Sequence, residues 1–93
     1  MNLVAPEVVG VAREGVVAGF RPEHVRLGCG VAARVESVER SGHEWLWHLD
    51  VRGTRVVARL AAGAARPGDD VRIEVDPSGL RLFDAATGEA VAR

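Results

Sequence analysis

Three side chains of the types that bind transition metals occur in the middle of the chain, namely Cys29, His43 and His48. His43 and His48 have opposite parity on a segment that we expect to be a strand, so their rings point to opposite faces of it. No Cys-x-x-Cys or His-x-x-x-His spacing supplies two ligands from one element. We therefore expect no metal site. We interpret Cys29, which stands between two glycines, as a loop thiol.

The acidic and hydroxyl side chains give no catalytic set either. Asp69, Asp70 and Asp76 lack the spacing of a calcium loop or of a paired acid and base, and we interpret them as solvated turn residues. The serines show no Ser-His-Asp arrangement. The chain has no lysine, which excludes a Walker A loop and Schiff-base chemistry, because each needs that ammonium group. We expect no catalysis, no nucleotide binding and no cofactor.

The composition is that of one small folded domain. The chain has 93 residues, of which 47% are hydrophobic and 27% charged, and its formal net charge is −1. This length usually supports one hydrophobic core. A net charge this small creates no overall electrostatic field that would attract the chain to nucleic acid or anionic lipid. No apolar run reaches the roughly 20 residues of a membrane-spanning helix, and we expect no signal peptide. The single cysteine fits a reducing cytoplasm.

Glycine and proline divide the chain into short, valine-rich segments, which is the pattern of strands in a sandwich or a barrel. Residues 3–12 are predicted to form a first strand at a sheet edge, because Pro6 lies near its start. Residues 16–20 are predicted to form the next strand. Pro22 is then expected to begin a single helical turn.

The clearest hairpin joins residues 31–40 to residues 43–51, with Ser41 and Gly42 as a two-residue connection. Its second strand carries both tryptophans of the chain on one face.

Of these two, Trp47 is expected in the core, since a strand face that also carries Leu49 and Val51 is a buried face. Trp45 lies nearer the hairpin tip. For that residue core packing and a role as an interface anchor both stay open.

Further strands are predicted over residues 54–60, 71–75 and 80–83, with turns at residues 67–69 and 76–79. No segment has the sustained periodicity of an amphipathic helix. About six or seven short antiparallel strands in so small a chain would leave bare edges on a flat sheet. We therefore predict an all-β fold, a small OB-like and partly closed barrel.

Four stretches resemble one protein family, in the family's order. Residues 19–25, GFRPEHV, resemble the G-[IF]-R-P-E-[HD]-[LV] segment of the TOBE domain, which follows the ATPase domain in carbohydrate-type bacterial ABC importers. Residues 35–44, VESVERSGHE, look like its V-x-x-V-E-x-x-G-x-E hairpin. Residues 80–89, LRLFDAATGE, look like its closing L-H-L-F-D-x-x-T-G-E, and residues 1–3 are similar to the M-N-[FL] that ends the linker from the ATPase domain.

The resemblance implies a single domain over residues 1–93, cut from the C-terminal part of a larger ATPase subunit, with residues 1–3 as the end of the interdomain linker. Two departures accompany it. Longer members carry additional strands where only residues 4–18 stand here, and the Walker loops of the family would lie upstream of this chain.

The role that the resemblance implies is non-catalytic regulation and dimerisation of an ABC-importer ATP-binding subunit for sugars or related organic solutes. The implied partners are a second copy of the chain, the ATPase domain of the parent chain, the membrane permease subunits indirectly and a cytoplasmic regulatory protein, with no nucleic acid. The implied location is the cytoplasm, at the inner face of the cell membrane through the transporter complex.

The family segments also mark candidate interface residues. Arg21 and Glu23 flank a proline and have two interpretations, a docking point for a partner subunit or an internal ion pair that pins the turn. The candidate set contains no catalytic and no metal-binding residue, and its members are Arg21, Pro22, Glu23, His24, Trp45, Leu82, Phe83 and Asp84.

Two other functions stay open. Proteins of this fold also bind molybdate-like oxyanions, but their S-A-R-N-type segment has only residues 32–35, AARV, as a weak counterpart here. An OB-type nucleic-acid-binding module needs a basic groove with aromatic platforms, whereas aromatic residues make up 4% of this chain.

Overall fold

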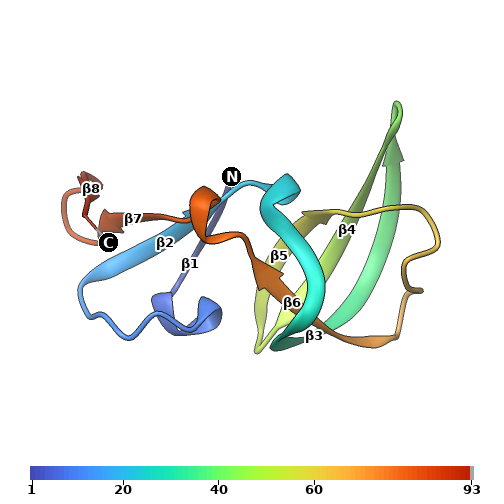
Figure 1. The fold of residues 1–93 in the computed structure, drawn as a ribbon, viewed down its shortest axis with the longest axis horizontal. Coiled ribbons are helices and arrows are strands. Elements are labelled where there is room, and N and C mark those ends of the chain that lie inside the picture. Colours follow the sequence, from blue (N-terminus) through green and yellow to red (C-terminus); the bar gives the residue numbers. More distant parts are fainter. Residues whose placement is uncertain (93) are drawn as a thin grey trace.

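The computed structural model describes residues 1–92 and shows an all-β chain (Figure 1). Its strands form two antiparallel four-stranded sheets. The smaller sheet has the order β1-β2-β7-β8, and its strands are β1 (Asn2–Val4), β2 (Val16–Phe20), β7 (Arg81–Asp84) and β8 (Ala90–Val91). The larger sheet has the order β5-β4-β3-β6, with β3 (Val25–Ser41), β4 (Glu44–Val51), β5 (Thr54–Arg59) and β6 (Asp70–Val75).

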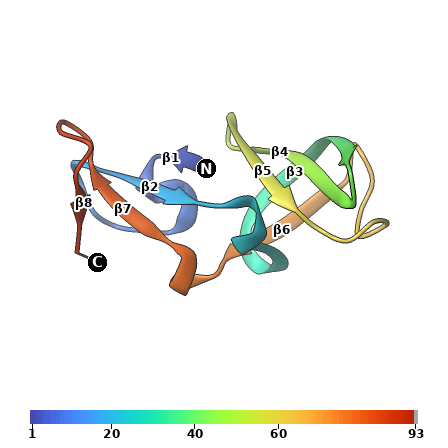
Figure 2. The same cartoon turned by 90° about the horizontal axis from the view of Figure 1, so that it is seen from above.

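The two sheets lie next to each other along the long axis of the molecule (Figures 1 and 2). The chain passes between them twice, through the 3-10 turns η2 (Pro22–His24) and η3 (Pro77–Gly79). The predicted all-β, OB-like class is confirmed. The described residues form eight strands, and their two sheets are not joined into one closed barrel. Within those residues, no helix is long and apolar enough to cross a membrane.

One core serves both sheets, and the alternation of side chains along the strands builds it. The larger sheet contributes the inner face of β4, where Trp47 is 1% exposed and the prediction that it lies in the core is confirmed. The smaller sheet contributes the side chains that point inward from β1, β2 and β7. The largest fully buried side chains of the chain are Trp47, Phe20, Leu49, Val35, Val51 and Val56.

The side chain of Asn2 ties the smaller sheet to the edge of the larger one. Its amide nitrogen donates to the carbonyl oxygen of Val57 and its amide oxygen accepts from the N–H of Val57, both at 2.8 Å. Asn2 is 8% exposed, and β5 is an edge strand. The amide therefore takes the place of a neighbouring strand and satisfies two backbone groups of that edge.

The prediction of one strand over residues 3–12 was wrong. β1 ends at Val4, and Pro6–Val9 forms the 3-10 turn η1, which Gly10 closes at φ +77°. Proline has no N–H for a strand ladder and its fixed φ favours the first position of a helical turn. Val8 is buried all the same, because its turn packs on the core.

The β3–β4 hairpin is present, but its two-residue connection is Gly42 and His43, not Ser41 and Gly42. Ser41 pairs with Glu44 across the ladder, and Gly42 has φ +61°. A two-residue turn of this kind places glycine first among its central residues, because that position needs a positive φ. The shift of one residue follows from that requirement.

Two further boundaries differ from the prediction. β3 begins at Val25, and Cys29 lies inside this strand, at an irregularity where Leu27 and Val31 both pair with Ile73. The chain also forms a further strand after residues 80–83, because β8 adds to β7 through the pair Leu82 and Val91.

Candidate functional site

The candidate residues Pro22, Glu23 and His24 form the crossover turn η2, and Arg21 directly precedes it. Pro22 begins this turn, as predicted, and the N–H of His24 donates to the carbonyl oxygen of Arg21 at 3.0 Å. The N–H of Arg21 donates back to Nδ1 of His24 at 3.4 Å. These two contacts close the turn at both ends and fix the direction in which β3 leaves it.

The internal ion pair considered for Arg21 and Glu23 is absent. Among residues 1–92 the ion pairs join Arg26 to Glu74, His48 to Glu39 and Arg59 to Glu44. Both Arg21 and Glu23 are exposed. The N–H of its own backbone, and after it the charge of Arg59, lower the pKa of the Glu23 carboxyl. The negative charge of Glu23 is thus stabilised first by the backbone of the turn, and the charges of Arg59, His24 and Arg21 add to this without an ion pair.

His24 packs against the second crossover turn, η3. A Cβ atom on Gly79 would lie 2.3 Å from Cγ of His24, so only glycine allows this approach. The N–H of Asp76 donates to the carbonyl oxygen of His24 at 2.8 Å. The two crossovers are therefore locked together, and the role of His24 that the structure shows is packing between them.

Asp76 caps the same turn. Its carboxylate accepts from the N–H of Ser78 at 3.0 Å and from the hydroxyl of Ser78 at 2.9 Å. These two donors, the N–H first, lower the pKa of the Asp76 carboxyl. Asp76 is thus a turn residue, and its carboxylate has a defined role, which is to hold η3 in place.

The closing segment supplies Leu82, Phe83 and Asp84 on β7. Leu82 points into the core. Asp84 accepts from the N–H of Ala86 at 2.8 Å and from that of Thr87 at 3.0 Å, and these donors, Thr87 first, lower the pKa of its carboxyl. The Asp84 side chain thus organises the turn between β7 and β8.

Phe83 points the opposite way and belongs to an apolar cluster on the outer face of the smaller sheet. Its ring, the sulfur of Met1 and a methyl group of Leu3 converge above Gly19. Met1 and Leu3 are 60% and 61% exposed. Together with Val17 these side chains line a shallow pocket of about 340 Å³. We call this surface, made of Met1, Leu3, Val17 and Phe83, the outer apolar face.

Trp45 lies away from both features, near the tip of the β3–β4 hairpin, which extends from the body of the molecule (Figure 1). Its side chain is half-buried and packs against the rim of the core. The guanidinium carbon of Arg40 lies 5.8 Å from the centroid of its ring, within the range of a cation–π contact. The sequence left two roles open for Trp45, core packing and interface anchor. The structure shows a side chain that packs partly on the core and keeps an accessible surface.

The structure thus separates the candidate residues into three places: the crossover turn η2, the hairpin tip, and β7 with its outer face. Sequence reasoning missed Asn2 and Gly79, which hold the sheets and the crossovers together. An asparagine between apolar residues at a strand position was the available signal for the first. No group of three or more His, Cys, Asp or Glu side chains within residues 1–92 is placed to hold a metal ion.

Comparison with known proteins places these features in a family. The model of the TOBE domain family matches residues 18–83, the span that runs from β2 through both crossovers to Phe83. A sulfoquinovosyl glycerol transport ATP-binding protein of Agrobacterium fabrum is 33% identical over 87 residues, which are 88% of this chain and 24% of that protein. An uncharacterized ABC transporter ATP-binding protein of Sinorhizobium fredii is 38% identical over 82 residues, 86% of this chain and 22% of that protein.

A third relative is an sn-glycerol-3-phosphate import ATP-binding protein of Agrobacterium fabrum, 31% identical over 80 residues, 82% of this chain and 21% of that protein. The chain thus spans about a quarter or less of the length of these relatives. All three are ATP-binding proteins of transport systems, and the resemblance drawn from the four sequence stretches is confirmed. This chain belongs to the TOBE domain family.

Proposed function

We propose that this chain is the non-catalytic regulatory and dimerisation domain of an ABC-importer ATP-binding subunit. In this proposal the ATP-binding domain belongs to the parent chain, and the solute is a sugar or a related organic molecule. The names of the relatives from Agrobacterium fabrum support that solute class. The proposed location is the cytoplasmic side of the membrane, where the domain meets the permease subunits through its ATPase and a regulatory protein has access to it.

The observation that carries the proposal is the outer apolar face on a domain of this family. Met1 and Leu3 are large apolar side chains left mostly exposed, beside the partly buried Val17 and Phe83. Exposed apolar surface of this kind marks interaction sites in proteins that function in complexes. Burial of each apolar Å² contributes roughly 25 cal/mol, so covering this face stabilises an assembly. We propose that a second copy of the chain covers it about a two-fold axis.

The hairpin tip supplies a second contact in this proposal. Trp45 retains accessible surface there, and tryptophan is enriched among residues that dominate binding energy. Arg21 and Glu23, exposed on η2, remain proposed docking residues for the partner subunit. Trp45 exposes less surface than the outer apolar face does, so we expect it to contribute less to self-association than that face.

Sedimentation velocity of the chain at several hundred micromolar tests the assembly. We expect weak self-association of the natural sequence, a several-fold larger dissociation constant for Leu3→Ser and a smaller increase for Trp45→Ala. Leu46→Ser is the matched control, because it makes the same change at a half-buried position on β4. A monomeric natural chain at all these concentrations, or an equal effect of Leu46→Ser, would contradict the assembly.

A further inference from the structure

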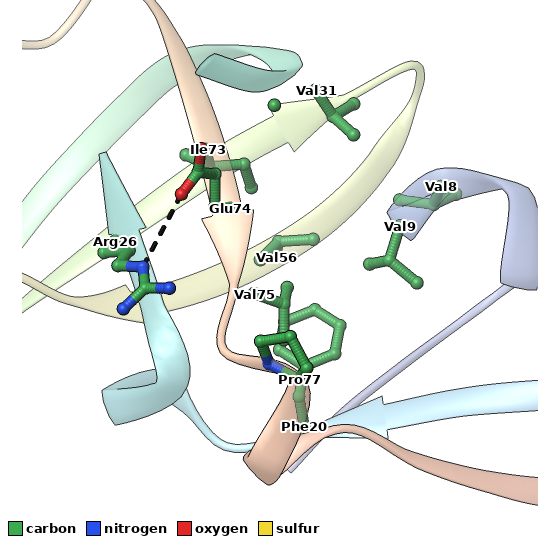
Figure 3. Close-up of a pocket in the computed structure, with 11 residues that line it drawn as sticks. Val8, Val9, Phe20, Arg26, Val31, Val56, Ile73, Glu74, Val75 and Pro77 are labelled. Atoms are coloured by element: carbon green, nitrogen blue, oxygen red, sulfur yellow. Dashed lines mark ion pairs between the residues drawn. The ribbon is translucent and has the colours of Figure 1, made fainter. Parts of the chain in front are cut away.

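A second pocket, distinct from the outer apolar face, opens between the two sheets and has a volume of about 310 Å³ (Figure 3). Four of its lining residues are buried apolar side chains, namely Val8, Phe20, Val56 and Ile73. These four side chains come from η1, β2, β5 and β6, so both sheets contribute to its floor. The pocket therefore exists only where the two halves of the fold meet.

One side of this pocket is charged. Figure 3 shows Arg26 and Glu74 on the side opposite Val8 and Val9, with their ion pair marked. Nε of Arg26 lies 3.6 Å from Oε2 of Glu74, and the two side chains are 60% and 39% exposed. This is a long, open pair, and such surface pairs contribute little to stability. The two charges are thus accessible at the rim of an apolar cavity.

The irregularity in β3 positions this charged side. The N–H of Cys29 donates to Oε1 of Glu74 at 3.0 Å. A Cβ atom on Gly30 would lie 2.2 Å from the carbonyl oxygen of Ile73, so the close approach of this segment to β6 requires glycine. Glu74 therefore has one oxygen fixed by the backbone, while the other faces the guanidinium of Arg26.

The combination of charges restricts the ligand that fits. A simple anion at this rim would meet the carboxylate of Glu74, and a simple cation would meet the guanidinium of Arg26. A molecule whose ammonium and carboxylate groups are attached to the same carbon pairs with both residues, because its carboxylate accepts from the planar donors of Arg26 and its ammonium group donates to Glu74. The apolar floor then accommodates an uncharged, branched group attached beside those charges.

We propose that this pocket binds a free α-amino acid with a branched aliphatic side chain, such as leucine. The volume lies at the low end of the range for ligand pockets, roughly 300–1,000 Å³, which fits a ligand of this size better than an oligosaccharide. The site is independent of the outer apolar face and goes beyond the proposed function. A ligand here contacts both sheets at once, and it stabilises the folded chain by binding that state preferentially.

Isothermal titration calorimetry and thermal unfolding of the chain with L-leucine test the site. We expect saturable binding below about 10 mM and a melting temperature that rises with leucine concentration. Three analogues each lack one recognised feature: 4-methylpentanoate lacks the ammonium group, 3-methylbutylamine lacks the carboxylate and glycine lacks the apolar group. Each analogue is expected to bind at least about tenfold more weakly than leucine.

Variants of the charged side distinguish this site from nonspecific binding. Arg26→Gln and Glu74→Gln are each expected to weaken leucine binding about tenfold or more, because each removes a charge-assisted contact. Glu74→Gln retains an oxygen for the N–H of Cys29, and its melting temperature without ligand reports whether the fold persists. The matched control is Arg59→Gln, which removes one partner of an ion pair at 2.8 Å on β5, outside the pocket lining.

The proposal is overturned if leucine gives neither heat nor thermal shift at 10 mM. Equal binding of leucine and 4-methylpentanoate would overturn the recognition of the two charges. An effect of Arg59→Gln as large as that of Arg26→Gln would show that the surface charge in general, and not this pocket, attracts the ligand. Loss of leucine binding in both pocket variants, with the control unchanged, supports the assignment.

Discussion

The larger and the smaller sheet pack their inner faces on one core, but their outer faces differ. On the larger sheet, Nε2 of His48 lies 2.7 Å from Oε1 of Glu39, and Nη1 of Arg59 lies 2.8 Å from Oε1 of Glu44. On the smaller sheet the outer positions carry Met1, Leu3, Val17 and Phe83 instead. A face of exposed polar side chains is well solvated by water, whereas an apolar face gains free energy when it is covered. This difference is the reason that the proposed contact surface lies on the smaller sheet.

The inner face of the larger sheet provides the test with the largest expected effect. Trp47→Ala should lower the free energy of unfolding by about 3–5 kcal/mol, because it leaves a large cavity in the shared core. Trp45→Ala, on the same strand but half-buried, should cost clearly less. Urea unfolding of both variants measures the difference. Equal losses would mean that Trp45, near the hairpin tip, contributes as much to the core as Trp47 does.

The junction between the sheets is the next test. Asn2→Ala leaves the N–H and the carbonyl group of Val57 without their side-chain partner, and we expect a loss of about 1–3 kcal/mol. Leu3→Ala, at the neighbouring exposed position, should change stability little. Hydrogen exchange at the amide of Val57 gives a local readout and should become faster only in Asn2→Ala. An unchanged exchange rate would show that the side chain of Asn2 does not protect the edge of β5.

A smaller effect is expected at the β4–β5 turn of the larger sheet, where Arg52 has φ +53° and Gly53 has φ +85°. Two successive residues with positive φ form the turn for which Asn-Gly is favoured. Arg52→Asn should therefore raise the free energy of unfolding by about 0.5–1 kcal/mol. Arg52→Ala is the control, since alanine does not favour this conformation. A similar gain in both variants would assign the effect to the arginine side chain and not to the backbone.

The smallest effect concerns the carboxylates of the turns at the ends of the smaller sheet. The pKa values of Glu23, Asp76 and Asp84 are lowered by backbone N–H groups of the folded chain. Their contribution to stability is complete above the unfolded pKa and is lost as the pH falls through the lower, folded pKa. Asp84→Asn should flatten the decline in stability below about pH 4, measured by urea unfolding. An unchanged acid profile would show that the hydrogen bonds of Asp84 do not depend on its charge.

The alternation of residue types was sufficient to predict β2, β4, β5 and β6 within about one residue, since one face of each is buried. It failed where a local backbone requirement dominates. Pro6 diverts a valine-rich stretch into η1, and the positive φ of Gly42 moves the hairpin turn by one residue. The glycines beside Cys29 indicated a break, but they allow β3 to continue past Ile73.

Side-chain contacts between distant segments were beyond the sequence. The family segments located η2 and β7, but not that the ring of His24 packs on Gly79 or that Asn2 bonds to Val57. Each of these contacts depends on the relative placement of the two sheets, which no local pattern encodes. For the same reason, the pocket that carries Arg26 and Glu74 became visible only in the folded chain.

The pairing of β2 with β7 has a consequence for the order in which the chain folds. Val17 pairs with Phe83, so this contact joins segments close to opposite ends of the sequence, whereas β3, β4 and β5 are connected by short hairpins. Loop-closure entropy delays contacts between distant segments. We expect the meander of the larger sheet to form first and the smaller sheet to close last. Mutations on β2 and β7 would then chiefly accelerate unfolding, while leaving the refolding rate almost unchanged.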